Sequence, residues 1–432
     1  MPPSEAARAD TTWPAAYAGG GQEGTPWWRE RRERARAAFE TLPMPTWRRG
    51  RGWSLQPEPL RLEAFAPVAA PPAPFPEASG QEAHVLLVDG RLARPAAGLP
   101  PGVEVIPLGP GGPDLLPTAA ADVLGAVVGP EAGKLEALNL AAMTGGALVR
   151  VARGARVGTL RLRHVVRTDG AAALPRLAVV LEEGAEATVL EECVDASGGG
   201  ARALVDGVSE VVVGEGARLR YVDVTEMGPL AKAVVRRRAR LGRDSRLEWT
   251  TGVFGGGFLA LAWDTELVAP GARLDATGVY LSGGREQHAL VSDTWHRAPA
   301  TEADVQFRGA VFDRSASVFD GIIRTEARAR GTVSHLGDHL LFLSPHAHAD
   351  SIPALLIEGD DVRVGHGATI GRVDPEQLYY LAARGIDPAE GREMLVLGYF
   401  EPTLERIPDS AVREAQRASI LRRVRATGGE TA

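Results

Sequence analysis

The sequence predicts a mainly β protein, with a right-handed parallel β-helix as its core and helical segments at both ends. The first observation is a small turn-like motif that recurs at residues 154, 184, 216, 244 and 271, at intervals of 27 to 32 residues. The second is that almost nothing helical interrupts residues 147 to 366, where short runs alternate Val, Leu and Arg. Such a period is typical of a solenoid, whose coils bury their apolar faces only by stacking. A β-sandwich would not need the recurring motif, although one sequence does not exclude it.

The N-terminal region, residues 1–80, is expected to be a helical segment followed by a linker. The stretch TPWWRERRERARAAFETLP spaces Trp28, Ala35 and Phe39 among charges at helical intervals, and Pro43 follows to stop the helix. The proline-rich stretch FAPVAAPPAPFPEASG, residues 65–80, is typical of an extended linker.

Residues 81–146 are expected to lead into the solenoid. AHVLLVDGRL predicts a short strand with a turn, and GPEAGKLEALNLAAM predicts an amphipathic helix that ends at Gly145 and Gly146. The β-helix core is then expected over residues 147–372.

Helical signals return in the C-terminal region, residues 373–432. Asp374 is placed to cap a helix that begins with Pro375, and the pair at 387–388 repeats this start. A last helix begins at Asp409 or Ser410. One apolar stripe is either core packing or a groove for a partner; it contains Met394, Leu395, Leu397, Phe400 and Leu404.

The net charge and the cysteine content argue against several classes of function. A formal net charge of -7 gives no reason to expect nucleic acid, and the run RRRAR at 236–240 is interpreted as a solvated face. No apolar stretch is long enough to span a bilayer and no signal peptide is recognisable, so we expect a cytosolic protein. The single cysteine, Cys193, excludes a disulfide or a cysteine-only metal site within this chain and is expected to be buried.

Some acids and histidines leave an enzyme open as an alternative. His346, His348 and Asp350 alternate, so they would share one face if the segment is a strand, and two histidines with a carboxylate can bind iron. A carbohydrate-active β-helix would instead need converging acids; the available ones are Asp293, Asp320, Asp360 and Asp361. His335 and His339 also share a strand parity, whereas His164, His288 and His296 stand alone and are expected to be packing or surface residues.

The stretch DDVRVGHGATIG, residues 360–371, places His366 between two glycines with no second ligand beside it. DDVRVGHGATIGRVDPEQLYYLAARGI resembles a signature of the SufB/SufD family, the scaffold subunits of the SUF iron–sulfur cluster assembly system. SDTWHRAPAT, FRGAVFDRSASVFDGIIR and LLFLSPHAHADSIPALLIEGDDV follow the family's order, and the resemblance covers about residues 130 to 400. Having one cysteine, the chain is most similar to the SufD branch.

The resemblance implies a non-enzymatic scaffold that pairs with SufB and binds the SufC ATPase through its C-terminal helices. It places His366 at the SufB interface as a transient ligand during cluster formation, because one protein ligand does not hold a cluster and the others would come from the partner. The family often has a cysteine at the position of Val364. No cofactor is expected to be bound stably by this chain alone, although the complex can use a reduced flavin. Self-association as a homodimer without SufB is left open.

Overall fold

The computed structural model describes residues 13–17, 25–45, 49–50, 53–54, 60–69, 83–94, 98–109, 123–407 and 409–426. Most of the predicted proline-rich linker, residues 70–80, lies outside these ranges. The described helices are η1 (Ala15–Tyr17), α2 (Pro26–Thr41), η2 (Leu62–Ala64), η3 (Pro130–Ala132), α4 (Lys134–Ala142), α5 (Pro375–Ala383), α6 (Pro388–Leu404) and α7 (Ser410–Ala426).

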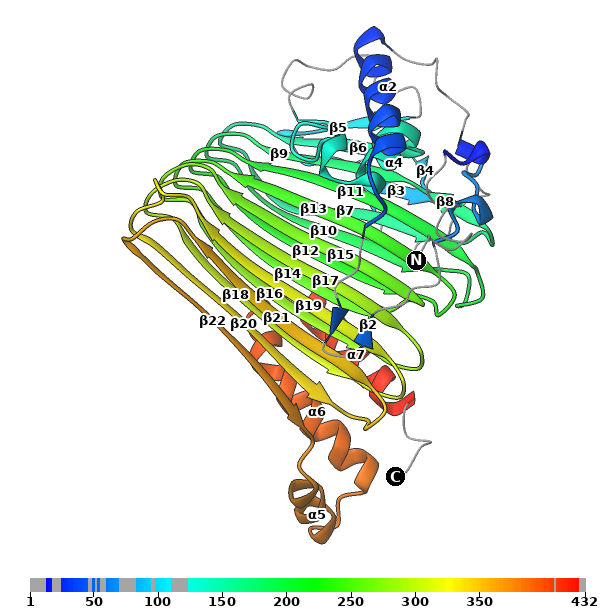
Figure 1. Cartoon of the computed structure of the whole chain (residues 1–432), viewed down its shortest axis with the longest axis vertical. Coiled ribbons are helices and arrows are strands. Elements are labelled where there is room, and N and C mark those ends of the chain that lie inside the picture. Colours follow the sequence, from blue (N-terminus) through cyan, green and yellow to red (C-terminus); the bar gives the residue numbers. More distant parts are fainter. Residues whose placement is uncertain are drawn as a thin grey trace.

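A parallel β-solenoid forms the body of the protein, which confirms the predicted fold class (Figure 1). Sheet 1 has the order β22-β20-β18-β16-β14-β12-β10-β7-β3-β4, and sheet 2 has the order β21-β19-β17-β15-β13-β11-β9-β6-β5, with β8 beside β11. From β6 onward, each coil gives one long strand to each sheet.

The strands of sheet 1 are β3 (Val85–Val88), β4 (Arg91–Arg94), β7 (Arg156–Val166), β10 (Glu186–Asp195), β12 (Arg218–Met227), β14 (Arg246–Gly255), β16 (Arg273–Ser282), β18 (Glu302–Val311), β20 (Thr332–Phe342) and β22 (Val362–Arg372). Those of sheet 2 are β5 (Val103–Leu108), β6 (Gly145–Val151), β8 (Ala171–Ala173), β9 (Pro175–Leu181), β11 (Ala203–Val213), β13 (Lys232–Leu241), β15 (Phe258–Leu267), β17 (Gln287–His296), β19 (Ala316–Thr325) and β21 (His348–Ile357). A separate two-stranded pair consists of β1 (Arg49–Gly50) and β2 (Trp53–Ser54).

The recurring motif of the sequence marks the turn at which the chain crosses between the sheets. Gly154, Gly184, Gly216, Asp244 and Gly271 all have positive φ, between 52° and 75°. Glycine adopts this left-handed conformation without steric cost, and Asp tolerates it better than most residues. Backbone hydrogen bonds of 2.8–2.9 Å from Gly154, Gly184 and Gly216 to the next coil hold these turns in a stack. The period of the sequence is therefore the length of one coil.

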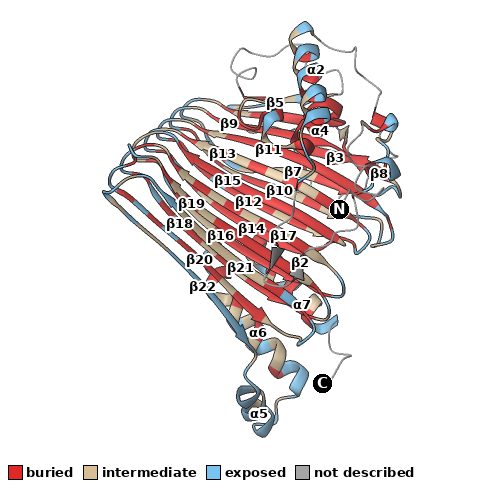
Figure 2. Ribbon diagram, viewed as in Figure 1, coloured by how far each residue is buried: buried red, intermediate tan, exposed pale blue. Residues whose placement is uncertain are grey.

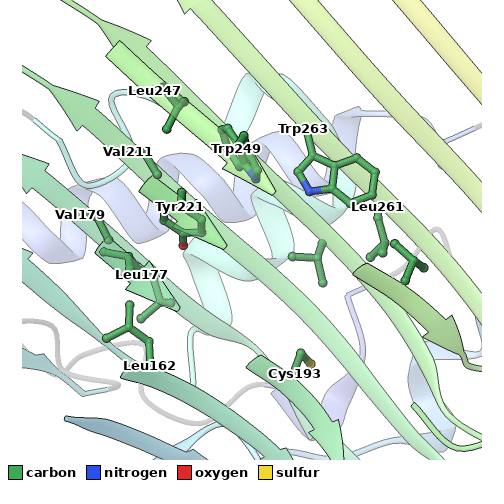
Figure 3. Packing of buried hydrophobic residues seen from close by; sticks show 14 of the residues in the cluster. Leu162, Leu177, Val179, Cys193, Val211, Tyr221, Leu247, Trp249, Leu261 and Trp263 are labelled. Carbon is green, nitrogen blue, oxygen red and sulfur yellow. The ribbon is translucent and has the colours of Figure 1, made fainter. Parts of the chain in front are cut away.

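Alternation along the strands fills the space between the two sheets with apolar side chains. In β13, for example, Val235, Ala239 and Leu241 are buried in the interior cluster, while Arg236, Arg238 and Arg240 face outward. Trp249 and Trp263 enter the same cluster from the two sheets (Figure 3). Burial of each large apolar side chain contributes about 1.5–3 kcal/mol, so stacking of coils is the main source of stability.

Two helices cover the outer face of sheet 2 at its N-terminal end. The predicted helix is present as α2; its Trp28 and Ala35 are buried and pack with residues of α4, β6 and β9. The predicted amphipathic character of the helix at 134–142 is wrong, because all nine residues of α4 are buried. This helix lies between α2 and the sheet, so it has no solvent-facing side.

The C-terminal helices begin where the sequence predicts. The carboxylates of Asp374, Asp387 and Asp409 accept hydrogen bonds of 2.8 Å from the first-turn amides of α5, α6 and α7. Helices α6 and α7 pack on the outer face of sheet 1, whereas α5 has no buried residue (Figure 2). Within the described chain, no helix combines the length and apolar character needed to cross a membrane.

Candidate functional site

The C-terminal end of the solenoid is open. Strand β22 pairs only with β20, and β21 pairs only with β19, so each of these terminal strands has one unpaired edge. No described strand or helix continues either sheet beyond them. An unpaired edge presents a row of free N–H and C=O groups, which is a template for pairing with another chain.

His366 lies in the middle of this open end. It belongs to β22, is in register with the buried Leu336 of β20, and is exposed. Val364, two residues earlier on the same face, packs partly against the interior core. Because alternate residues of a strand share a face, His366 stands at the mouth of the solenoid interior, where the next coil would otherwise cover it.

Apolar side chains surround the open end. Leu356 and Ile357 of β21 are 50% and 44% exposed, and Ile370 of β22 is 57% exposed. Figure 2 shows β22 as the most exposed strand of its sheet. Clustered exposed apolar residues are typical of a surface that another molecule covers.

The remaining histidines near this end do not form a metal centre with His366. His346 lies in a turn before β21, so it does not share a strand face with His348 and Asp350 as the alternation suggested. His335 and His339 face outward from β20; the Nδ1 of His335 is 2.9 Å from Gln306 and that of His339 is 2.6 Å from Thr369. Among the described residues, no group of three His, Cys, Asp or Glu side chains is arranged to hold a metal ion.

The acids considered for an enzyme also lie apart. Asp293 pairs with Arg324 at 2.9 Å on the outer face of sheet 2, and burial raises its pKa. Asp320, on the neighbouring strand, lines a different part of that face beside α4. Asp360 and Asp361 are in the turn before β22.

A buried polar cluster inside the solenoid was missed by the sequence analysis. Arg237 is fully buried and contacts Glu191 at 3.0 Å and Asp223 at 3.5 Å. Asp223 also accepts hydrogen bonds from the indole N–H groups of Trp249, at 2.7 Å, and Trp263, at 3.1 Å. The interpretation of residues 236–240 as a solvated face is therefore wrong for Arg237, which has the inward parity of Val235 and Ala239.

Burial controls protonation in this cluster. Burial alone would raise the pKa of Glu191, but the charge of Arg237 and the hydrogen bonds from Arg237 and Tyr221 outweigh it, so that pKa is lowered. Burial also lowers the pKa of His164 to about 4, and it raises that of the Cys193 thiol to about 12. His164 is thus neutral at pH 7, and Cys193 is a buried, unreactive thiol, as predicted.

His288 and His296 are likewise buried rather than exposed. The Nε2 of His288 is 2.7 Å from the carbonyl oxygen of Gly255, and the Nδ1 of His296 is 2.8 Å from Thr301. Burial lowers the pKa of each to about 4, so both are neutral packing residues.

The apolar stripe of α6 is divided between two environments. Phe400 and Leu404 are fully buried against sheet 1, so they cannot contact a partner in this structure. Leu395 and Leu397 are partly buried, whereas Met394 is 50% exposed. Tyr379 and Tyr380 of α5 are 78% and 57% exposed. A partner-binding role stays a prediction, and burial restricts it to the outer residues.

Comparison with known proteins places these features in context. Residues 164–399 match the family described as SUF system FeS cluster assembly, SufBD core domain. The chain is 31% identical over 294 residues to the iron–sulfur cluster assembly protein SufD of Bacillus subtilis, covering 68% of this chain and 67% of that protein. It is 33% identical over 262 residues to a SufBD family protein of Mycobacterium tuberculosis (58% and 64% covered), and 25% identical over 276 residues to one of Staphylococcus saprophyticus (64% and 59% covered).

Proposed function

Because the chain belongs to the SufBD family of iron–sulfur cluster assembly proteins, we propose that it is a SufD-like scaffold subunit of a SUF complex. In this proposal its open end pairs with a SufB subunit, its C-terminal helices bind the SufC ATPase, and His366 contributes a nitrogen ligand while a cluster forms. The cluster is cargo, not a resident cofactor.

The exposure of His366 on an unpaired edge strand is the observation on which the proposal rests. An imidazole on that edge can be reached by a second protein without any change in the monomer. One nitrogen donor is insufficient for a cluster, which normally takes four protein ligands. Cys193, the only thiol of the chain, is buried, so sulfur ligands would have to come from the partner.

Pairing with a homologous subunit is favoured by the kind of surface at the open end. Each sheet ends in a strand with a free edge, and such edges match a partner that ends in similar strands, since strand addition uses the same backbone hydrogen bonds as the sheet itself. Leu356, Ile357 and Ile370 would then be covered.

The exposed residues of α5 and α6 support a second contact. The described chain has nine exposed large hydrophobic residues, and three of them are Tyr379, Tyr380 and Met394. Three more lie at the open end, so the two proposed surfaces together hold six of the nine. Tyr and Met are enriched at protein interfaces. Deleting residues 374–432 would be a poor test, because it would also uncover the outer face of sheet 1.

The His366→Ala variant tests the cluster role. We expect normal folding and a loss of more than half of the iron and acid-labile sulfide on the complex purified after co-expression with SufB and SufC. The matched control is His335→Ala, which changes an exposed histidine on the neighbouring strand β20. Equal loading of the wild type and His366→Ala would refute the ligand role.

Two further variants separate the proposed interfaces. Ile370→Asp places a charge on the open edge and should prevent co-purification with SufB while SufC binding persists. Tyr379→Ser combined with Met394→Ser should have the opposite effect. Loss of both partners in either variant, with an unchanged melting temperature, would contradict the assignment of two separate surfaces.

The reduced flavin remains a prediction for the assembled complex, and no residue of this chain is assigned to it. The alternative of a metal-dependent or carbohydrate-active enzyme is not favoured by any arrangement of the described residues, since its histidines and acids lie apart.

A further inference from the structure

A basic pocket of about 460 Å³ opens on the outer face of sheet 2, at the rim where its strands begin. Its volume is within the range of small-molecule sites, about 300–1,000 Å³. Among the described residues that line it, four are cationic and none is acidic; the cationic ones are Arg61, Arg202, Lys232 and Arg285. The chain as a whole has a net charge of -7, so this concentration of positive charge does not follow from composition.

The solenoid itself brings the cations together. Strands β11, β13, β15 and β17 are consecutive neighbours in sheet 2. Three of the cations lie in or next to the turns that precede β11, β13 and β17, namely Arg202, Lys232 and Arg285. Lys232, Phe258 and Gln287 are direct register partners on β13, β15 and β17. Neighbouring strands are about 4.8 Å apart, so Arg202 and Arg285 stand roughly 14 Å apart at the backbone.

The fourth cation comes from a segment far away in the sequence. Arg61 immediately precedes η2, and its backbone is in the left-handed region, with φ 52°. This segment is fastened to the solenoid rim by backbone hydrogen bonds between Ala66 and Gly170, at 3.0 Å, and between Ala172 and Ala66, at 2.8 Å. A strained backbone at a non-glycine residue persists where the surrounding structure holds it, and such residues concentrate at binding sites.

The charges in the pocket are only partly neutralised. Arg202 pairs with Asp169 at 2.6 Å. Within the described part of the chain, Arg61 and Arg285 form no ion pair, in contrast to outward-facing arginines such as Arg236, which contacts Asp264 at 2.6 Å. Glu286, next to Arg285, is engaged by Arg423 of α7 at 3.1 Å. Two arginines therefore remain available to an anion.

Part of the pocket lining is apolar, which indicates that a ligand would carry an apolar group as well as negative charge. Phe65 and Phe258 pack together in one cluster at the floor, and Leu230 is 51% exposed beside them. A single phosphate would not reach cations at both ends of a pocket of this length, and it would leave the apolar wall uncovered. Guanidinium groups bind phosphate oxygens with two hydrogen bonds each, and a diphosphate offers enough oxygens for more than one such contact.

We propose that this pocket binds a small molecule that carries a diphosphate and a planar apolar group, of the nucleoside diphosphate type. The pocket is built from the middle coils and the segment around η2, so the proposal is independent of the open end and of the scaffold role of His366.

Calorimetric titration of the purified full chain at low ionic strength tests the proposal, with pyrophosphate, ADP and adenosine as probes. We expect saturable binding of pyrophosphate and ADP with Kd below about 1 mM, and none of adenosine. The double variant Arg61→Gln/Arg285→Gln should weaken both at least tenfold. If that variant does not fold, Arg285→Glu alone, at an exposed turn position, should do the same.

Arg314→Gln is the matched control, because Arg314 occupies the equivalent turn of the next coil and does not line the pocket. It should change the Kd by less than twofold. The proposal is overturned if neither diphosphate binds, if adenosine binds as well as ADP, or if Arg314→Gln weakens binding as much as the double variant. Binding of an acidic peptide without binding of pyrophosphate would also overturn it.

Discussion

Replacement of Asp338 by Asn should stabilise the protein at alkaline pH and leave its stability unchanged at acidic pH. Asp338 lies on the inner face of β20 and is fully buried. Burial raises its pKa to about 7, and the hydroxyls of Ser351 and Tyr280 oppose this only in part. The Tyr280 hydroxyl is 3.2 Å from one carboxylate oxygen, and no cation pairs with the group among the described residues.

The difference between a pKa of about 7 and the ordinary value of 3.8 sets the magnitude. It corresponds to about 4 kcal/mol, at about 1.36 kcal/mol per pH unit. Because the unfolded carboxyl ionises near pH 4 and the folded one near pH 7, folding is favoured by the bound proton at low pH. This advantage is lost as pH rises from about 4 to about 7, and the full cost of burying the carboxylate applies above pH 7.

Urea denaturation at pH 5 and pH 8 measures this effect. At pH 8 the free energy of unfolding of Asp338→Asn should exceed that of the wild type by about 1–4 kcal/mol, the upper figure applying if no solvent enters around the carboxylate. At pH 5 the excess should fall to at most about 2 kcal/mol, because the folded carboxyl is neutral there but the unfolded one is already ionised, and it should vanish only below the unfolded pKa of 3.8. Asp275→Asn, at an exposed pair on the same sheet, is the control. A variant no more stable than the wild type at pH 8 would refute the reasoning.

Three further predictions concern the interior and the helices. Arg237→Met should lower the free energy of unfolding by about 3–5 kcal/mol, because it leaves the two buried carboxylates that contact Arg237 without a cation. Arg273→Gln, which removes an exposed ion pair, is the control and should lower it by at most about 1 kcal/mol in the same urea denaturation assay. Phe400→Ala should cost about 3–5 kcal/mol by leaving a cavity on sheet 1, and Met394→Ala less than about 1 kcal/mol. Cys193 should resist alkylation by iodoacetamide at pH 8 and react once the protein is unfolded in urea, as mass spectrometry would show.

The coil length could be predicted from the sequence because a backbone requirement determines it. The turn between the sheets needs a left-handed residue, and glycine or aspartate supplies it once per coil at Gly184, Gly216 and Asp244. Because one backbone position in each coil needs this conformation, the same residue types recur there in the sequence. The residues on the inward face of a strand are harder to predict. Arg236 and Arg237 are the same residue type, and only the register of the strand places Arg237 inside. That register depends on pairing across coils, which sequence alone does not provide.

The helices show the same limit. Their starts at Asp374 and Asp387 could be predicted because a capping side chain bonds to an amide two residues later. The surfaces that the helices cover could not. Phe400 and Met394 belong to one apolar stripe, yet the first packs on sheet 1 and the second faces solvent. Which side of a helix is buried depends on the neighbouring sheet, and that sheet is formed by residues far away in the sequence, such as Gly309, 90 positions before Tyr399.

The two ends of the solenoid differ in a way that bears on the proposed partner. At the N-terminal end, the antiparallel strands β4 and β5 close the two sheets, and α2 and α4 cover the adjoining face. At the C-terminal end, β21 and β22 have no such closure, and the chain turns away into helices that pack on the outer face of sheet 1 instead. Stacked-coil proteins need a polar cap at each end to stay soluble. An end that exposes Leu356, Ile357 and Ile370 lacks one, so a second protein with matching strands is the natural cap, and His366 lies where the two would meet.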